Sequence, residues 1–134
     1  MPNENCIFCK IVKGEMPAMK IYEDEKVLAF LDINPVNFGH TLVIPKEHYD
    51  MMTDTPDEAL SYIFKIVNKL MKQIKVSMEA NYVALAVTGV DVAHFHVHLI
   101  PRYYTDGLAT FWPTKQYGDG EMTATAEKIL SLTQ

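Results

Sequence analysis

Residues 94–102 read HFHVHLIPR and place three of the chain's five histidines at alternate positions. On a β-strand, successive side chains point to opposite faces of the sheet. A strand over this stretch therefore puts His94, His96 and His98 on one face and the intervening apolar residues on the other. We expect the apolar face to pack against the main helix, and the imidazoles to line the open side of the sheet.

The spacing of these histidines argues against one shared metal ion. A strand rises by about 3.3 Å per residue, so the outer two Cα atoms would lie roughly 13 Å apart. Metal–nitrogen bonds are only about 2.0–2.1 Å long. Two of the three could bind a metal together, but all three could not, so the three histidines must have different functions. Three independent surface histidines are the simpler alternative, and the unbroken apolar face opposite them argues against it.

Further strand-like runs predict a mostly antiparallel sheet of about five strands. Each run is short, apolar and bounded by turn residues. The predicted strands cover 20–23, 26–33, 40–45, 81–88 and 94–101. The tight link between the first two favours a hairpin, and the fourth is expected to be a buried strand beside the fifth.

Apolar residues between 56 and 78 recur at the i, i+3, i+4, i+7 spacing of one helical face. The stretch TPDE at 55–58 marks the start of this helix, with Thr55 as its capping residue and Pro56 at the first helical position. The fold class that follows is α+β, with one main helix packed across a face of the antiparallel sheet.

Composition and charge favour a small soluble protein. The chain has 134 residues, of which 49% are hydrophobic, and its formal net charge is −5. Lys and Arg are scattered, which argues against a nucleic-acid or anionic lipid partner. No stretch approaches the roughly 20 apolar residues that span a bilayer, and residues 1–5 lack the basic-then-apolar order of a signal peptide. We therefore expect a cytoplasmic location and no membrane partner.

The chain is expected to form a single domain over residues 1–134, because no linker or internal repeat divides it. The motifs occupy residues 6–102. A tail at 103–134 is rich in aromatic and turn residues, and it is predicted to end in a short helix near 124–132.

Cys6 and Cys9 are the only cysteines and form a C-x-x-C pair. Asn5 can cap a short helix through Lys13, with Gly14 as its stop signal, and the i, i+3 spacing then places both sulfurs on one helical face. A disulfide framework would need more cysteines, and a thioredoxin-type dithiol would follow a core strand. Half of a zinc site is the favoured interpretation, with two further ligands from elsewhere in the chain.

Two other stretches accompany the triad, CIFCKIVKGEMP at 6–17 and VLAFLDINPVNFGHTLVIPKEHY at 27–49. With HFHVHLIPR, they stand in the order and at the spacing of the histidine triad superfamily of nucleotide hydrolases and transferases. The chain resembles the zinc-containing bacterial type of this superfamily over about residues 6–102. The spacing differs only in the stretch before the triad.

The resemblance implies chemistry at the α-phosphate of a purine nucleotide or nucleotide conjugate. In the family the middle histidine attacks phosphorus, which carries over to His96. A neutral imidazole suits this role, because its unperturbed pKa of about 6.5 leaves it largely unprotonated near pH 7. By the same resemblance, His98 contacts the α-phosphate and His40 lies beside the nucleophile. The expected substrates are nucleoside phosphoramidates or dinucleoside polyphosphates.

The resemblance also implies a metal site and a nucleotide pocket. Zinc-bearing relatives bind the metal through a C-x-x-C pair, a downstream histidine and the first triad histidine. The matching ligands here are Cys6, Cys9, His48 and His94. Four protein ligands would make the zinc structural, and no organic cofactor is implied.

In the nucleotide pocket, the resemblance gives Asp32 the role of accepting hydrogen bonds from both ribose hydroxyls, which two carboxylate oxygens suit. Four apolar residues would form the walls around the base, although each could equally be a core residue. They are Phe8, Ile11, Phe30 and Ile33.

The approach to the triad, TGVDVAH at 88–94, departs from the family pattern. Many members carry a longer turn with Gly-Gln that supplies amide contacts to phosphate, whereas Val90 and Asp91 stand here. An acid beside a phosphate would repel it, unless Asp91 points away or orients a donor. The departure motivates one alternative function, a nucleotide-binding or regulatory module without catalysis. A zinc-organised interaction domain that binds no nucleotide is a second alternative.

Histidine triad proteins of this type are usually two-fold dimers, so the resemblance implies a homodimer. The apolar helix at 56–78 and the tail aromatics Phe111, Trp112 and Tyr117 offer surface for a self-complementary interface. The tail is then expected to approach the nucleotide site of the partner.

Overall fold

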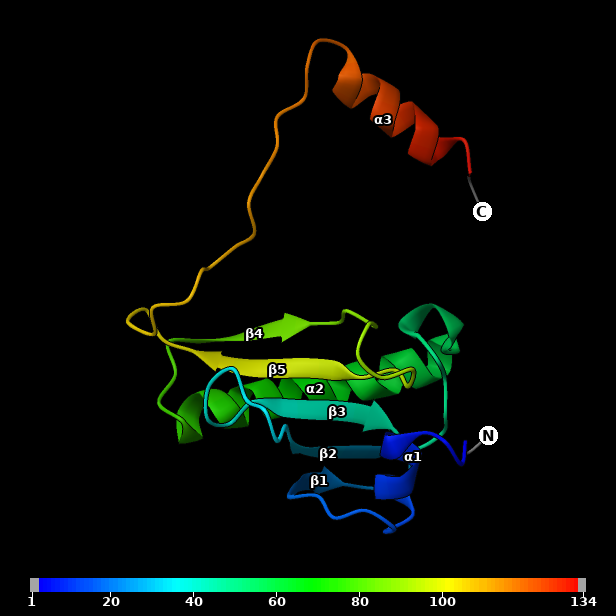
Figure 1. The fold of residues 1–134 in the computed structure, drawn as a ribbon, viewed down its shortest axis with the longest axis vertical. Coiled ribbons are helices and arrows are strands. Elements are labelled where there is room, and N and C mark those ends of the chain that lie inside the picture. The colour runs from blue at the N-terminus through cyan, green and yellow to red at the C-terminus, as the bar shows by residue number, and fades with distance from the viewer. Residues whose placement is uncertain (1–2, 133–134) are drawn as a thin grey trace.

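The computed structural model describes residues 3–132, which form one five-stranded antiparallel sheet and three α-helices (Figure 1). The strand order is β1-β2-β3-β5-β4. The strands are β1 Lys20–Glu23, β2 Val27–Leu31, β3 Thr41–Pro45, β4 Tyr82–Ala86 and β5 Val97–Arg102. The helices are α1 Ile7–Val12, α2 Asp57–Ser77 and α3 Glu121–Leu130, with a 3-10 turn at Met52–Asp54. The α+β prediction is confirmed, including the β1–β2 hairpin.

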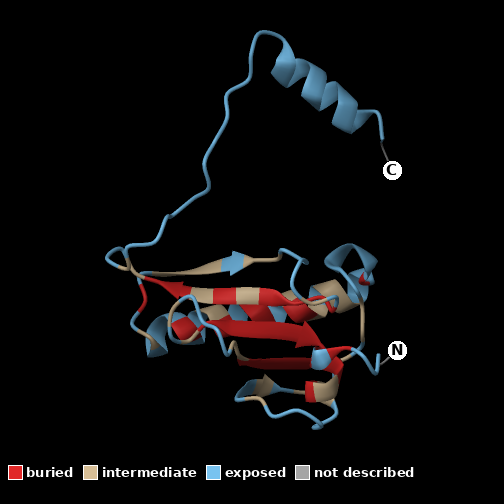
Figure 2. Ribbon diagram, viewed as in Figure 1, coloured by how far each residue is buried: buried red, intermediate tan, exposed pale blue. Residues whose placement is uncertain are grey.

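Each face of the sheet has its own apolar core. On one face, the stripe of α2 that includes Val67 and Leu70 packs against the apolar side chains that alternate with the triad histidines, as the sequence predicts. These side chains are Phe95, Val97 and Leu99. On the other face, α1 packs over residues of β2 and β3 such as Leu28 and Ile44. Figure 2 shows that the buried residues gather in the central strands β2, β3 and β5.

The prediction of a buried strand at 81–88 is wrong in its burial. β4 lies at the edge of the sheet and pairs only with β5 among the described residues. Most of its residues are half-buried, and Leu85 is exposed. An unbroken apolar run predicts a strand that is covered on both faces. Here α1 packs over β2 and β3, away from the β4 edge of the sheet.

The start of α1 also differs from its prediction. Cys6, and not Asn5, is the capping residue, because its sulfur accepts a hydrogen bond from the Cys9 backbone N–H at 3.3 Å. Gly14 follows the helix with a φ of +81°, the left-handed conformation expected of a glycine stop signal. The helix therefore begins with a residue of the C-x-x-C pair.

The other helix boundaries shift by one to three residues. Pro56 is the capping position of α2, and its carbonyl accepts the first helical hydrogen bond. Thr55 does not cap the helix, because its hydroxyl donates to the Met51 carbonyl at 3.0 Å. α3 begins at Glu121, three residues before the predicted 124, and the predicted tail extends beyond the described residues at 133–134.

The tail leaves β5 as an extended segment, and α3 stands away from the sheet (Figure 1). None of the residues of α3 is buried. Phe111, Trp112 and Tyr117 are 80%, 63% and 58% exposed, so these aromatic side chains lack cover from their own domain. Among residues 3–132, no helix has the combination of length and apolar character that crossing a bilayer requires.

Candidate active site and metal centre

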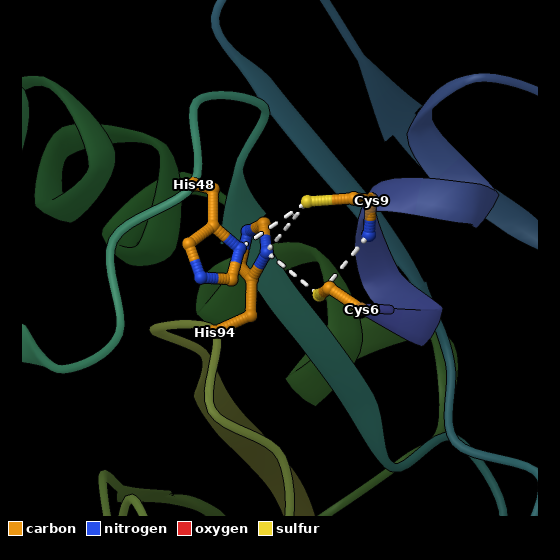
Figure 3. Close-up of side chains that lie close together, drawn as sticks. All are labelled: Cys6, Cys9, His48 and His94. Atoms are coloured by element: carbon orange, nitrogen blue, oxygen red, sulfur yellow. Dashed lines mark hydrogen bonds between the residues drawn. The ribbon is translucent and has the colours of Figure 1, made fainter. Parts of the chain in front are cut away.

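Four predicted metal ligands converge from three segments of the chain (Figure 3). Cys6 and Cys9 come from the start of α1, His48 from the loop after β3, and His94 from the segment before β5. One ligand atom of each residue lies within 4.8 Å of the others. The Nδ1 atom of His94 is 3.4 Å from the Cys6 sulfur, and that of His48 is 3.2 Å from the Cys9 sulfur.

Hydrogen bonds set both imidazoles of this cluster to present Nδ1 to the sulfurs. The Nε2 atom of His94 lies 2.8 Å from the Pro45 carbonyl oxygen, and that of His48 lies 2.8 Å from a carboxylate oxygen of Asp50. Both partners only accept hydrogen bonds, so each Nε2 carries the proton and each Nδ1 keeps its lone pair. Burial lowers the pKa of His94 to about 4, which keeps this ring neutral near pH 7.

The donor set fits a structural zinc site. Two cysteine sulfurs and two imidazole nitrogens at these separations can surround one ion tetrahedrally, with no position left for a substrate. The protons fixed on the outer nitrogens match the arrangement in which a carbonyl or carboxylate orients a metal-bound histidine. The Asp50 carboxylate was not predicted. Its position two residues after His48 was the available signal.

We expect Asp50→Asn to weaken zinc binding by about 10–100-fold, the usual cost of losing an outer-shell partner. The amide would no longer hold the His48 ring with a charged acceptor. Competition with a chromophoric chelator measures the affinity. Glu127→Gln, which neutralises an exposed acid on α3, is the matched control, and equal zinc affinities for the two variants would contradict the assigned role.

His96 lies beneath α1 and is only 2% exposed. Its Nδ1 atom is 2.7 Å from the carbonyl oxygen of His94, so in the neutral ring Nδ1 carries the proton and Nε2 holds the lone pair. The ring of Phe8 packs edge-on against it, with centroids 5.2 Å apart. The residue that completes the metal cluster therefore also fixes the tautomer of His96.

The expected open row of imidazoles is wrong in two respects. His94 and His96 precede β5, and only His98 lies within the strand. His94 and His96 are buried, because α1 covers this side of the sheet and Phe8 contacts both rings. Burial makes the protonation state of each ring depend on its hydrogen bonds, which a solvated row would not.

His40 and His98 form a chain of directed hydrogen bonds. The backbone N–H of Val36 donates to Nδ1 of His40 at 3.1 Å, so the proton of His40 sits on Nε2. That Nε2 lies 2.9 Å from Nδ1 of His98 and donates to it. His98 then keeps its own proton on Nε2. Burial lowers the pKa of both rings, which favours the neutral forms that this chain requires.

A sharp turn brings His40 into this position. Gly39 has a φ of +100°, and a Cβ atom there would lie 2.9 Å from the Cγ atom of Met78, so both conformation and space favour glycine. The His40 carbonyl accepts a hydrogen bond from the backbone N–H of Asp32 at 2.9 Å. The Asp32 carboxylate thereby lies 3.6 Å from Nε2 of His40, just beyond the end of β2.

The predicted pocket residues all line one cavity beside α1 and β2. Its polar side includes Asp32, His96 and His98. The apolar side includes Phe8, Ile11, Phe30 and Ile33. The first three are buried core residues as well as walls of the cavity, so both interpretations of them are correct. Ile33 is 90% exposed and is not a core residue. The cavity can therefore accept a planar apolar group next to the histidines.

Asp91 does not point away from this site. One of its carboxylate oxygens lies within 4.8 Å of ring nitrogens of both His96 and His98. The cavity therefore carries two carboxylates, since Asp32 also lines it. Within the described residues that line this cavity, there is no lysine or arginine.

Comparison with known families matches residues 13–105 to the HIT domain. This match covers more than half of the chain, and the chain therefore belongs to the histidine triad (HIT) family. The resemblance inferred from the three sequence stretches is confirmed. One relative is the adenosine 5′-monophosphoramidase of Schizosaccharomyces pombe, which is 42% identical over 132 residues, covering 95% of this chain and 97% of that protein.

Solved structures with the same fold include a HIT family protein from Bacillus subtilis. It has a TM-score of 0.88 and 39% identity, and the match covers 98% of this chain and 99% of the other. A zinc-bound histidine triad family protein from Mycobacterium smegmatis has a TM-score of 0.74 and 33% identity, with 96% and 98% of the two chains covered. Both matches extend beyond the sheet into the tail region.

Proposed function

We propose that this protein is a nucleotide hydrolase that cleaves a nucleoside phosphoramidate or a dinucleoside polyphosphate at the α-phosphate. The observation that carries the proposal is the buried His96, whose Nε2 lone pair is kept free by the hydrogen bond from Nδ1 to the His94 carbonyl. The ring borders the cavity beside α1. The relative named adenosine 5′-monophosphoramidase supports this reaction class.

In the first step, Nε2 of His96 attacks the α-phosphorus and forms a phosphorus–nitrogen bond. The bond from phosphorus to the leaving group breaks, and the leaving group takes the electron pair and, if it is an amine, a proton from solvent. In the second step, water attacks the same phosphorus and loses one proton to solvent. The phosphorus–nitrogen bond to His96 breaks, and its electron pair returns to Nε2. One difficult displacement is thereby divided into two easier ones.

The neighbouring side chains position and stabilise the phosphorus centre. His98 donates its Nε2 proton to a phosphate oxygen, and its orientation is held by the hydrogen bond from His40. Asp32 accepts from the ribose hydroxyls, since its Oδ1 atom bonds only one backbone N–H, that of Asn34 at 2.9 Å. The apolar walls enclose the base. A donor aimed at the developing charge typically contributes 10²–10³-fold in rate.

The metal cluster would hold one structural zinc ion. Zinc bound there would supply a fixed junction and no chemistry, because protein side chains would take all four coordination positions. The residues Cys6, Cys9 and His48 would then fix His94, and the His94 carbonyl holds His96. The zinc-bound relative from Mycobacterium smegmatis supports this assignment.

An assay of adenosine and guanosine phosphoramidates and dinucleoside polyphosphates tests the proposed function. Turnover of at least one substrate, releasing a nucleoside monophosphate, is the expected result. Tight nucleotide binding without any turnover would instead favour a binding or regulatory module. Absence of both binding and turnover would favour a zinc-organised interaction domain.

We further propose a homodimer. Three features support an interface with a second copy. The tail aromatics are exposed, the outer edge of β4 pairs with no other strand of residues 3–132, and the tail stands away from its own domain. The match to the Bacillus subtilis structure over 98% of this chain also supports a defined tail conformation. A two-fold pairing would bury these surfaces on both copies.

Light scattering at micromolar concentration is expected to give the mass of two chains. Replacing both Phe111 and Trp112 by alanine should shift the mass toward one chain, because the two side chains are 80% and 63% exposed and gain cover only from a partner. Phe38→Ala, which removes an exposed aromatic side chain in the loop between β2 and β3, is the control. The mass of one chain for the unmodified protein would contradict the dimer.

A further inference from the structure

The cavity beside α1 meets a second groove at the triad. Both are lined by Asp32, Asn34, Asp91 and His98. The second groove continues across the outer part of the sheet, over Ala86 at the end of β4, Thr88 just after it and Ile100 of β5. His96 borders the first cavity and is absent from the lining of the second. The two hollows therefore adjoin at His98, and only the first of them reaches His96.

The position of the second groove, which His96 does not line, matches the geometry of displacement at phosphorus. Attacking and leaving atoms stand roughly in line through the phosphorus atom. When the base and ribose fill the apolar cavity, the α-phosphate lies at the junction, beside His98. A group that departs away from His96 then enters the second groove.

The charges along this groove favour one class of leaving group. Its charged lining residues are the carboxylates of Asp32 and Asp91, and among the described residues that line it there is no lysine or arginine. A departing polyphosphate carries several negative charges and normally requires cationic partners. A protonated nitrogen would pair with Asp91, while its methylene groups would pack on Val90 and Ile100.

We infer that the groove across β4 and β5 is a leaving-group subsite, in which Asp91 selects amines that carry a positive charge over polyphosphates. The inference rests on the proposed function and narrows its substrate class. In the reaction, the phosphorus–nitrogen bond breaks, the amine nitrogen takes the electron pair and a proton from solvent, and the second, protonated nitrogen of the amine remains paired with Asp91. Asp91 thus acts on specificity and takes no part in the bond changes.

Three substrates with the same adenosine half test this inference. They are the adenosine 5′-phosphoramidates of 1,4-diaminobutane and of butylamine, and diadenosine tetraphosphate. The unmodified enzyme should prefer the diamine conjugate to the butylamine conjugate by roughly fivefold in kcat/KM, near the upper end for an exposed ion pair. It should use the tetraphosphate least. The diamine preference should decrease as salt rises, because salt screens an exposed pair.

Asp91→Asn should remove the diamine preference and raise the relative use of the tetraphosphate several-fold. Glu25→Gln, an exposed acid that lines neither cavity, should leave both ratios as in the unmodified enzyme. Unchanged ratios in Asp91→Asn, or a preference of the unmodified enzyme for the tetraphosphate, would overturn the inference. Failure of the proposed function itself would be distinct, because none of the three substrates would then turn over.

Discussion

His96→Asn is expected to lower kcat by about 10⁴-fold or more while the fold, the zinc content and the nucleotide affinity are retained. Removing the nucleophile of a covalent mechanism has effects of this size or larger. The asparagine amide can still donate a hydrogen bond to the His94 carbonyl, so the local backbone keeps its partner. Only the attacking nitrogen is lost.

His98→Asn provides the matched comparison, because it removes a neighbouring imidazole that is not the nucleophile. It should lower kcat by about 10²–10³-fold, the usual effect of losing one donor to a charged reaction centre. Single-turnover kinetics and a nucleotide titration on each variant separate chemistry from binding. A His96→Asn enzyme that is as active as His98→Asn would contradict the division of functions within the triad.

His94→Asn is expected to act as a stability mutation. The His94 ring is fully buried, and its Nδ1 atom faces both cysteine sulfurs. Loss of this ligand should release the zinc and lower the melting temperature by about 10 °C or more, because metal binding is coupled to folding. Activity should fall as well. The carbonyl of residue 94 accepts the hydrogen bond from His96, and without the metal ligand the backbone that carries this carbonyl is no longer held in place.

The unmodified protein, purified without chelator, should contain close to one zinc per chain by elemental analysis. A strong chelator should lower its melting temperature to near that of His94→Asn, and it should have little further effect on the variant. His98→Asn, which leaves the metal cluster intact, should keep both the zinc and the response to chelator. Zinc-free protein with an unchanged melting temperature after chelation would remove the structural-zinc proposal.

The sheet and the main helix were predictable because they rest on local periodicity. Alternation in residues 94–102 assigned Phe95, Val97 and Leu99 to the α2 side, and this assignment survives although β5 begins only at Val97. The apolar stripe of α2 was equally predictable from the sequence. Burial on the other face was not, since no local pattern indicates that α1 folds over the histidines.

The candidate site was only partly predictable, for a similar reason. Residue types and family resemblance indicated which histidines belong to the site. Their tautomers, however, depend on backbone groups distant in the sequence, such as the Pro45 carbonyl that accepts a hydrogen bond from His94. The contact between Asp50 and His48 and the approach of Asp91 to His96 also required the folded chain. β4 was misjudged because an apolar run does not reveal how many of its faces are covered.

The most direct test of the account is to trap the intermediate. The unmodified enzyme is mixed with a rapidly cleaved adenosine phosphoramidate, quenched within one turnover under conditions that preserve phosphorus–nitrogen bonds, digested and examined by mass spectrometry. We predict an added adenylyl mass on the peptide that contains residues 94–102, localised to His96 by fragmentation and absent from His96→Asn. An adenylyl group on any other residue, or rapid turnover with no adenylated peptide, would contradict the covalent mechanism.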